Sequence, residues 1–263
     1  MNVVKRPPGL ILDIDGAILR GDQVIPGTVE TIAELRRRGH PVVFITNALE
    51  SPTEQANRLT KAGIIVSEDE IITAPQILEE YLRQNLPDAT IYVISDSPLP
   101  ESLAKDFRLS ENPDEIDAVI VSCDRNFNFR KLNIGYQALR LGARFFATNA
   151  DRTCPIEGGE IPDAAAVIGA LEGCSGRKVE LVAGKPSAMI VDMVLEQLGL
   201  QTSDCLMAGD RLETDILMGV QAGMSTALVL TGVTQPEALI HSPVQPDFVL
   251  NSISEVSSLQ TPS

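Results

Sequence analysis

The sequence is poor in the residues that build zinc sites and disulfide frameworks. Among its 263 residues there are no tryptophans, two histidines and four cysteines. The cysteines form no C-x-x-C pair and are irregularly spaced, so a Cys/His zinc site is not expected. We expect free thiols in a reducing compartment, and therefore a cytoplasmic protein. The cysteines are Cys123, Cys154, Cys174 and Cys205.

Basic residues are also scarce. The 21 lysines and arginines are outnumbered by 36 aspartates and glutamates, which gives a net charge of −15. This excludes the basic surface expected of proteins that bind nucleic acid or anionic membranes. An anionic substrate is still compatible with this charge, but its site needs local cations, and a bound metal ion is the simplest source. The first eight residues do not resemble a signal peptide, and no apolar run reaches transmembrane length.

Short apolar segments alternate with helical patterns along most of the chain. Residues 9–14 and 41–46 have the character of buried strands, and amphipathic helical patterns follow each of them. This alternation predicts parallel βαβ units, and hence an α/β protein with a doubly wound, Rossmann-like parallel sheet.

A second set of strands and helices interrupts the first. Strands are expected near residues 89–95, 118–122 and 143–148, with helices near Glu101, Leu132 and Ala165. From a strand at 179–183 onward the first set of alternating strands and helices resumes, with strands at 206–208 and 226–230 and a helix over 213–221. We therefore predict a discontinuous core domain over 1–75 and 180–263, with an inserted α/β cap domain over 76–179.

Two aspartates end the first apolar strand. Asp13 and Asp15 are two residues apart, so their side chains can point the same way, and Gly16 permits a tight turn. In doubly wound sheets, ligands bind outside the carboxyl ends of the strands. The plainer interpretation is a polar loop in which Asp15-Gly16 is only a turn signal.

Three further strands end in polar residues. The strand over 41–46 ends in Thr46-Asn47, whose donors could hold a phosphate oxygen, although either residue could instead form a local turn. Lys185 follows the strand over 179–183 and would supply positive charge beside the aspartates; a solvated loop lysine is the usual alternative. It is not part of a Walker loop, because Val179 stands at the first glycine position.

The fourth strand ends in Gly209-Asp210, with Asp215 just inside a following helix. Asp210 could join Asp13 and Asp15 around a hard cation, since magnesium prefers oxygen ligands. Asp215 could equally be a favourable charge in the first turn of a helix. Each pattern is weak by itself, but the order D-x-D, T-N, G-K-P and G-D-x-x-x-T-D is more specific than any of them.

These four motifs together resemble the haloacid dehalogenase-like hydrolases, and the NagD-like (subclass IIA) phosphatases in particular. Further likeness extends along most of the chain: the opening segment over 15–21 and 24–27, the long insertion between Asn47 and Lys185, and the loop Thr148-Asn149-Ala150-Asp151 with Pro155. Within that subfamily the sequence is most similar to sugar-phosphate phosphatases of the AraL kind. Ala17 stands where many members of the family have threonine, and Ala48 where asparagine is common. Neither position carries a residue assigned to the chemistry, so these departures affect the prediction of the substrate more than that of the reaction.

The resemblance implies a phosphoric monoester hydrolase that uses Mg²⁺ and an aspartyl-phosphate intermediate. It implies Asp13 as nucleophile, Asp15 as general acid/base, and Lys185 with Thr46 and Asn47 as phosphoryl ligands. Asp13, the backbone carbonyl of Asp15, and Asp210 would bind the metal, with Asp215 supporting them.

The organic part of the substrate must be recognised from outside these motifs. Asn149 and Asp151, after a strand of the insertion, are candidates to bind sugar hydroxyls, although turn formation explains them equally well.

The expected partner is a small phosphorylated metabolite, with no nucleic acid and no membrane. The sequence does not determine the oligomeric state; relatives in this subfamily often form homodimers through their caps. Two alternatives stay open: a phosphomutase or phosphotransferase on the same scaffold, and a non-catalytic sugar-phosphate-binding regulatory protein.

Overall fold

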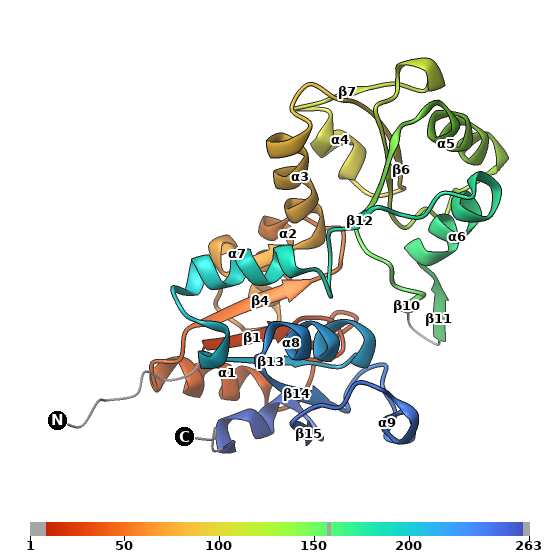
Figure 1. Ribbon diagram of the computed structural model, residues 1–263. Helices are drawn as coiled ribbons and strands as arrows, with labels where there is room; N and C mark the ends of the chain where they lie inside the picture. Colours follow the sequence, from red (N-terminus) through yellow and green to blue (C-terminus); the bar gives the residue numbers. More distant parts are fainter. Residues whose placement is uncertain (1–8, 157–158, 260–263) are drawn as a thin grey trace. The chain divides into compact units, whose positions relative to one another are not determined.

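The structure is a computed structural model that describes residues 9–156 and 159–259. Residues 1–8, on which the comparison with signal peptides rests, lie outside the described residues. The chain divides into two compact units (Figure 1). The first consists of residues up to Thr46, Pro52–Ile72 and residues from Lys185 onward, and the second of Asn47–Ser51 and Thr73–Gly184.

The first unit is built on a six-stranded sheet with the order β15-β14-β13-β1-β4-β5. The central strand β1 pairs in parallel with β13 on one side and with β4 on the other, and β14 pairs in parallel with β13 and β15. All residues of β1, β4 and β13 are buried, as expected for parallel strands covered on both faces. The strands are β1 (Gly9–Asp13), β4 (Val42–Thr46), β5 (Ile71–Thr73), β13 (Cys205–Gly209), β14 (Ser225–Val229) and β15 (Phe248–Leu250).

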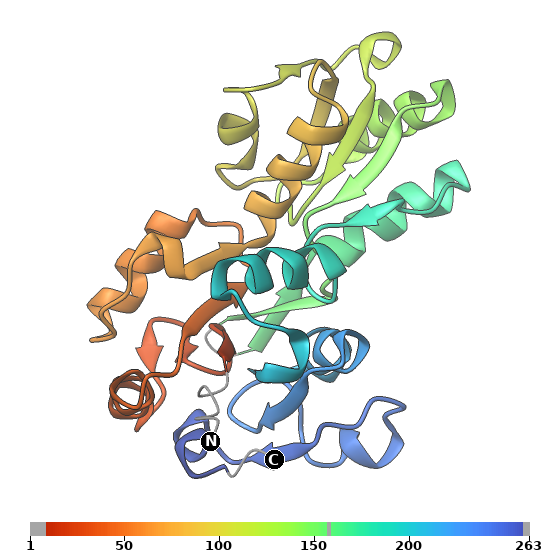
Figure 2. The same cartoon turned by 60° about the vertical axis from the view of Figure 1, so that its left-hand side comes forward.

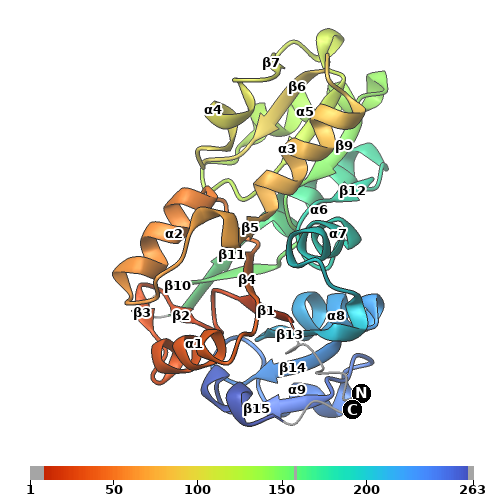
Figure 3. The ribbon, with the colours of Figure 1, turned by 90° about the vertical axis from the view of Figure 1, so that its left-hand side faces the viewer.

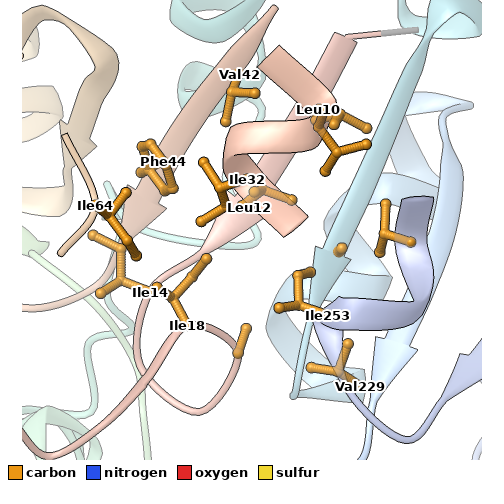
Figure 4. Close-up of a cluster of buried hydrophobic side chains, with 14 of the residues drawn as sticks. Leu10, Leu12, Ile14, Ile18, Ile32, Val42, Phe44, Ile64, Val229 and Ile253 are labelled. Carbon is orange, nitrogen blue, oxygen red and sulfur yellow. The ribbon is translucent and has the colours of Figure 1, made fainter. Parts of the chain in front are cut away.

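Helices cover both faces of this sheet. Figure 3 shows α1 (Thr28–Arg37) and α2 (Pro52–Lys61) on one side, and α7 (Ala188–Leu198) and α8 (Leu217–Ala222) on the other. On the α1 side, Leu10 and Leu12 of β1 and Phe44 of β4 pack with Ile32 of α1 in a continuous apolar cluster (Figure 4). The unit also contains a short helix, α9 (Ala238–His241), and a small antiparallel hairpin, β2 (Leu19–Arg20) and β3 (Gln23–Val24).

The second unit has its own parallel sheet with the order β12-β9-β8-β6-β7. In Figure 2, β6, β8 and β9 run side by side in yellow-green to green. Residues of α5 and α6 share one apolar cluster with this sheet, and Tyr81 of α3 meets the ring of Phe146 edge-on, at 5.6 Å between centroids. The strands are β6 (Thr90–Ile94), β7 (Arg108–Leu109), β8 (Ala118–Val121), β9 (Arg144–Ala147) and β12 (Leu181–Val182); the helices are α3 (Ala74–Asn85), α4 (Leu99–Leu103), α5 (Phe129–Leu141) and α6 (Ala164–Ser175).

An antiparallel hairpin, β10 (Thr153–Ile156) and β11 (Gly159–Pro162), also belongs to the second unit. The sequence patterns did not indicate it, because neither strand alternates apolar and polar residues over a sufficient length.

One strand lies in a different sheet from the one expected. The prediction assigned the chain from residue 180 onward to the core, but β12 pairs with β9, with Leu181 opposite Phe146, and the first unit resumes only at Lys185. A two-residue apolar strand carries no periodicity that identifies its sheet, so only the pairing decides it.

The predicted fold class, a doubly wound parallel α/β core with a second α/β unit inserted in it, is confirmed. In the described part of the chain all four cysteines are free. No helix over 9–156 and 159–259 is long and apolar enough to cross a membrane.

Candidate active site

The end of β1 carries a buried ion-pair cluster. The side chain of Asp13 forms an ion pair with Lys185, whose Nζ also lies 2.7 Å from Oδ1 of Asp215. All three side chains are at most 5% exposed. The lysine is therefore held between two carboxylates, which supply the charge partners that a buried lysine needs.

Burial dominates the electrostatics of this cluster. Removal from water raises the pKa of Asp13 well above its ordinary value; Asp215 raises it further, and Lys185 opposes the rise. Burial alone would lower the pKa of Lys185, but Asp13 and Asp215 more than offset this and raise it. Lys185 therefore stays protonated, and its single positive charge lies beside the carboxylates of both Asp13 and Asp215.

Asp210 follows β13 and adds another buried carboxylate. Its side chain is 1% exposed, and Oδ2 accepts a hydrogen bond of 2.6 Å from the backbone N–H of Val233. Oδ1 is buried and has no hydrogen-bond partner among the described residues. Burial, followed by repulsion from Asp215, raises the pKa of Asp210 to about 6.

Two glycines make room for this carboxylate. A Cβ at Gly16 or at Gly232 would collide with the side chain of Asp210. Gly16 also has φ of 92°, in the left-handed region that favours glycine. Its backbone is held in place, because its carbonyl accepts a hydrogen bond of 2.6 Å from the hydroxyl of Thr231.

The carboxylates of Asp13, Asp210 and Asp215 suit a hard cation. One oxygen from each lies within 4.8 Å of the others, all three residues are buried, and Oδ1 of Asp210 has no hydrogen-bond partner in the described part of the chain. Oxygen-only ligands of this kind are those that Mg²⁺ prefers. Asp215, expected only to support the metal site, belongs to this group, whereas the carboxylate of Asp15 does not.

Asp15 lies beside the buried cluster in sequence but faces other partners. Its side chain is 36% exposed, and its Oδ1 accepts a hydrogen bond of 2.7 Å from Arg58. Thr46, at the end of β4, is buried, and its hydroxyl lies 3.4 Å from Oδ2 of Asp15. Arg58 was not predicted as a site residue, because an arginine within an amphipathic helix gives no local signal of function.

The remaining predicted residues form a network within the second unit. The side-chain amide of Asn47 donates to Oδ2 of Asp151 at 3.0 Å, and that of Asn149 donates to the backbone carbonyl of Asn47 at 3.3 Å. Asn149 also accepts from the backbone N–H of Asp151 at 3.2 Å. Asn149 is 2% exposed, so its polar atoms are used to hold the segment that carries Asn47.

Comparisons with known proteins show which family this chain resembles. A model described as haloacid dehalogenase-like hydrolase matches residues 10–106, and a related HAD-hydrolase-like model matches residues 182–256. Sugar-phosphatase AraL of Bacillus subtilis (strain 168) is 35% identical over 256 residues, which cover 96% of this chain and 93% of the relative.

Two solved structures are similar over nearly the whole chain. The p-nitrophenyl phosphatase from Archaeoglobus fulgidus has a TM-score of 0.88 and 34% identity, and covers 96% of this chain and 99% of its own. NagD from E. coli K-12 has a TM-score of 0.83 and 30% identity, with 94% and 97% covered.

Proposed function

Because this chain belongs to the haloacid dehalogenase-like hydrolases and is a NagD-like (subclass IIA) phosphatase, we propose that it hydrolyses small sugar phosphates in a Mg²⁺-dependent reaction through an aspartyl-phosphate on Asp13. The observation that carries the proposal is the buried cluster at the end of β1. There Asp13 and Asp215 contact Lys185, and Oδ1 of Asp210 has no hydrogen-bond partner among the described residues.

Asp13 is the proposed nucleophile. A carboxylate oxygen of Asp13 attacks phosphorus, and the bond between phosphorus and the ester oxygen breaks. The nucleophile must be ionised, yet burial raises its pKa. The ammonium of Lys185 counteracts this and would also stabilise the charge on the phosphoryl oxygens in the transition state.

Asp13, Asp210 and the backbone carbonyl of Asp15 would hold the metal, with Asp215 beside them. A divalent cation bound there would supply positive charge that offsets repulsion between the nucleophile and the phosphate dianion. Oδ1 of Asp210, which has no hydrogen-bond partner within 9–156 and 159–259, supports this assignment, because a buried unpaired carboxylate oxygen is otherwise costly.

Asp15 is the proposed general acid/base. In the first step it donates a proton to the departing ester oxygen, which leaves as an alcohol. In the second step it takes a proton from the water that attacks the phosphorus of the aspartyl-phosphate, which releases inorganic phosphate and regenerates Asp13. Asp15 is therefore protonated again when the cycle is complete.

The second unit is proposed to act as the cap, and Thr46 and Asn47 to bind the phosphoryl group with Lys185. Asn149 and Asp151 would contribute to substrate binding through Asn47, to which both are hydrogen-bonded. The sugar-phosphate class is supported by the similarity to a relative named sugar-phosphatase.

The test is phosphate release by purified protein from a panel of sugar phosphates, nucleoside monophosphates and p-nitrophenyl phosphate. We expect the highest kcat/KM with a sugar phosphate, loss of activity in EDTA and recovery with Mg²⁺. Equal amounts of alcohol and inorganic phosphate would identify hydrolysis rather than phosphoryl transfer. Full activity in EDTA would contradict the metal assignment, and preference for another ester class would contradict the substrate assignment.

A further inference from the structure

Arg58 connects helix α2 to the loop that carries Asp15. One terminal nitrogen, Nη2, donates hydrogen bonds of 2.7 Å to Oδ1 of Asp15 and of 2.7 Å to the backbone carbonyl of Gly21. Its Nε lies 3.7 Å from the carboxylate of Asp22. The guanidinium thus contacts both Asp15 and the turn of the β2–β3 hairpin.

These contacts distinguish the two oxygens of the Asp15 carboxyl group. Oδ1 is held by the short, charge-assisted bond from Arg58, whereas among the described residues Oδ2 has only the longer contact of 3.4 Å with the Thr46 hydroxyl. Because Oδ1 is occupied as an acceptor, a proton on this carboxyl group belongs on Oδ2. The planar guanidinium also restricts rotation of a side chain that is otherwise 36% exposed.

We propose that Arg58 is a positioning residue for the acid/base reaction. It orients Asp15 so that Oδ2 carries the transferred proton. This inference rests on the proposed function of Asp15. In the first step the bond from Oδ2 to its proton breaks, a bond from that proton to the leaving ester oxygen forms, and the electron pair of the P–O bond stays on that oxygen. Arg58 takes no part in the bond changes.

If Arg58 positions Asp15, the loss of kcat/KM on removing Arg58 should depend on the leaving group of the substrate. A sugar phosphate releases a strongly basic alkoxide oxygen that needs the proton, whereas p-nitrophenolate departs readily without it. The parameter kcat/KM includes departure of the leaving group but not the later hydrolysis of the aspartyl-phosphate. Loss of orientation at Asp15 should therefore lower kcat/KM for the sugar phosphate selectively.

The experiment compares Arg58→Met with Arg36→Met in the full-length protein with Mg²⁺. Arg36 is a matched control in the same unit: it forms an ion pair of 2.6 Å with Glu70 and its side chain is 29% exposed, against 24% for Arg58. Both pairs are partly exposed, so neither variant should shift the thermal midpoint by more than about 3 °C.

We expect Arg58→Met to lower kcat/KM for the sugar phosphate by on the order of 10- to 100-fold, since misplacing a reacting group by about 1 Å can cost this much. The loss with p-nitrophenyl phosphate should be less than about threefold, and Arg36→Met should change neither. Equal losses on both esters, or no loss on the sugar phosphate, would overturn the positioning role.

Asp15→Asn separates this inference from the function on which it rests. If Asp15→Asn shows the selective loss and Arg58→Met does not, the acid/base assignment stands and the role of Arg58 is refuted. If Asp15→Asn itself shows no dependence on the leaving group, the assignment of Asp15 fails, and the inference about Arg58 fails with it.

Discussion

Replacing Asp210 with asparagine should make the metal-free protein more stable at neutral pH while removing activity. The side chain is 1% exposed and lies among like charges, yet a functional metal site requires it to be ionised. Asparagine has the same shape and can still accept the hydrogen bond from the backbone N–H of Val233. The substitution therefore removes a buried charge and keeps the packing.

The magnitude follows from the pKa of Asp210, which is about 6 against an ordinary value of 3.8. Because the folded-state pKa is raised, ionisation destabilises the fold, and stability is lost as pH rises from about 4 through 6. One pKa unit corresponds to about 1.4 kcal/mol, so ionised Asp210 costs about 3 kcal/mol at pH 7.5 and about half of that at pH 5. The variant escapes this cost.

The assay is urea unfolding in EDTA at pH 5 and pH 7.5, with Asp192→Asn, an exposed aspartate of α7, as the control. We expect Asp210→Asn to gain about 3 kcal/mol over the wild type at pH 7.5 and clearly less at pH 5. Saturating Mg²⁺ should stabilise the wild type more than the variant. A variant that is less stable than the wild type at pH 7.5, or a gain that does not change with pH, would refute this account of the site.

The other predictions concern covalent chemistry and the network around Asn47. Asp13→Asn should form no aspartyl-phosphate, because an amide is a poor nucleophile, whereas Asp15→Asn should still accumulate the aspartyl-phosphate from p-nitrophenyl phosphate. Intact-protein mass spectrometry after rapid quenching checks both variants. Covalent phosphate on Asp13→Asn would disprove the assignment of Asp13 as nucleophile. Asn149→Ala and Asp151→Ala each remove a partner of Asn47, so kcat/KM should fall about tenfold for both a sugar phosphate and p-nitrophenyl phosphate. A loss confined to the sugar phosphate would show instead that these side chains read the sugar.

The sequence by itself was sufficient to predict the fold class and the strand ends that carry polar residues. Apolar runs of about five residues that end in polar residues or glycine are local features, and they correspond to β1, β4 and β13. The pairing of these strands in one parallel sheet follows from the βαβ alternation. It brings Asp13 and Asp210 to the same edge, as the parallel pairing of β1 with β13 requires.

Tertiary structure alone decided the partners of individual side chains. Asp215 lies in a π-helical segment, Leu212–Ile216, and its Oδ2 accepts from the backbone N–H of Arg211 at 3.0 Å, which leaves Oδ1 for Lys185. The position of Asp215 at the start of a helix does not by itself indicate that its carboxylate faces Lys185. The contact of Arg58 with Asp15 joins residues 43 positions apart, and the sheet that β12 joins depends on pairing with β9. Such contacts depend on the distances between folded elements, and local sequence patterns do not contain those distances.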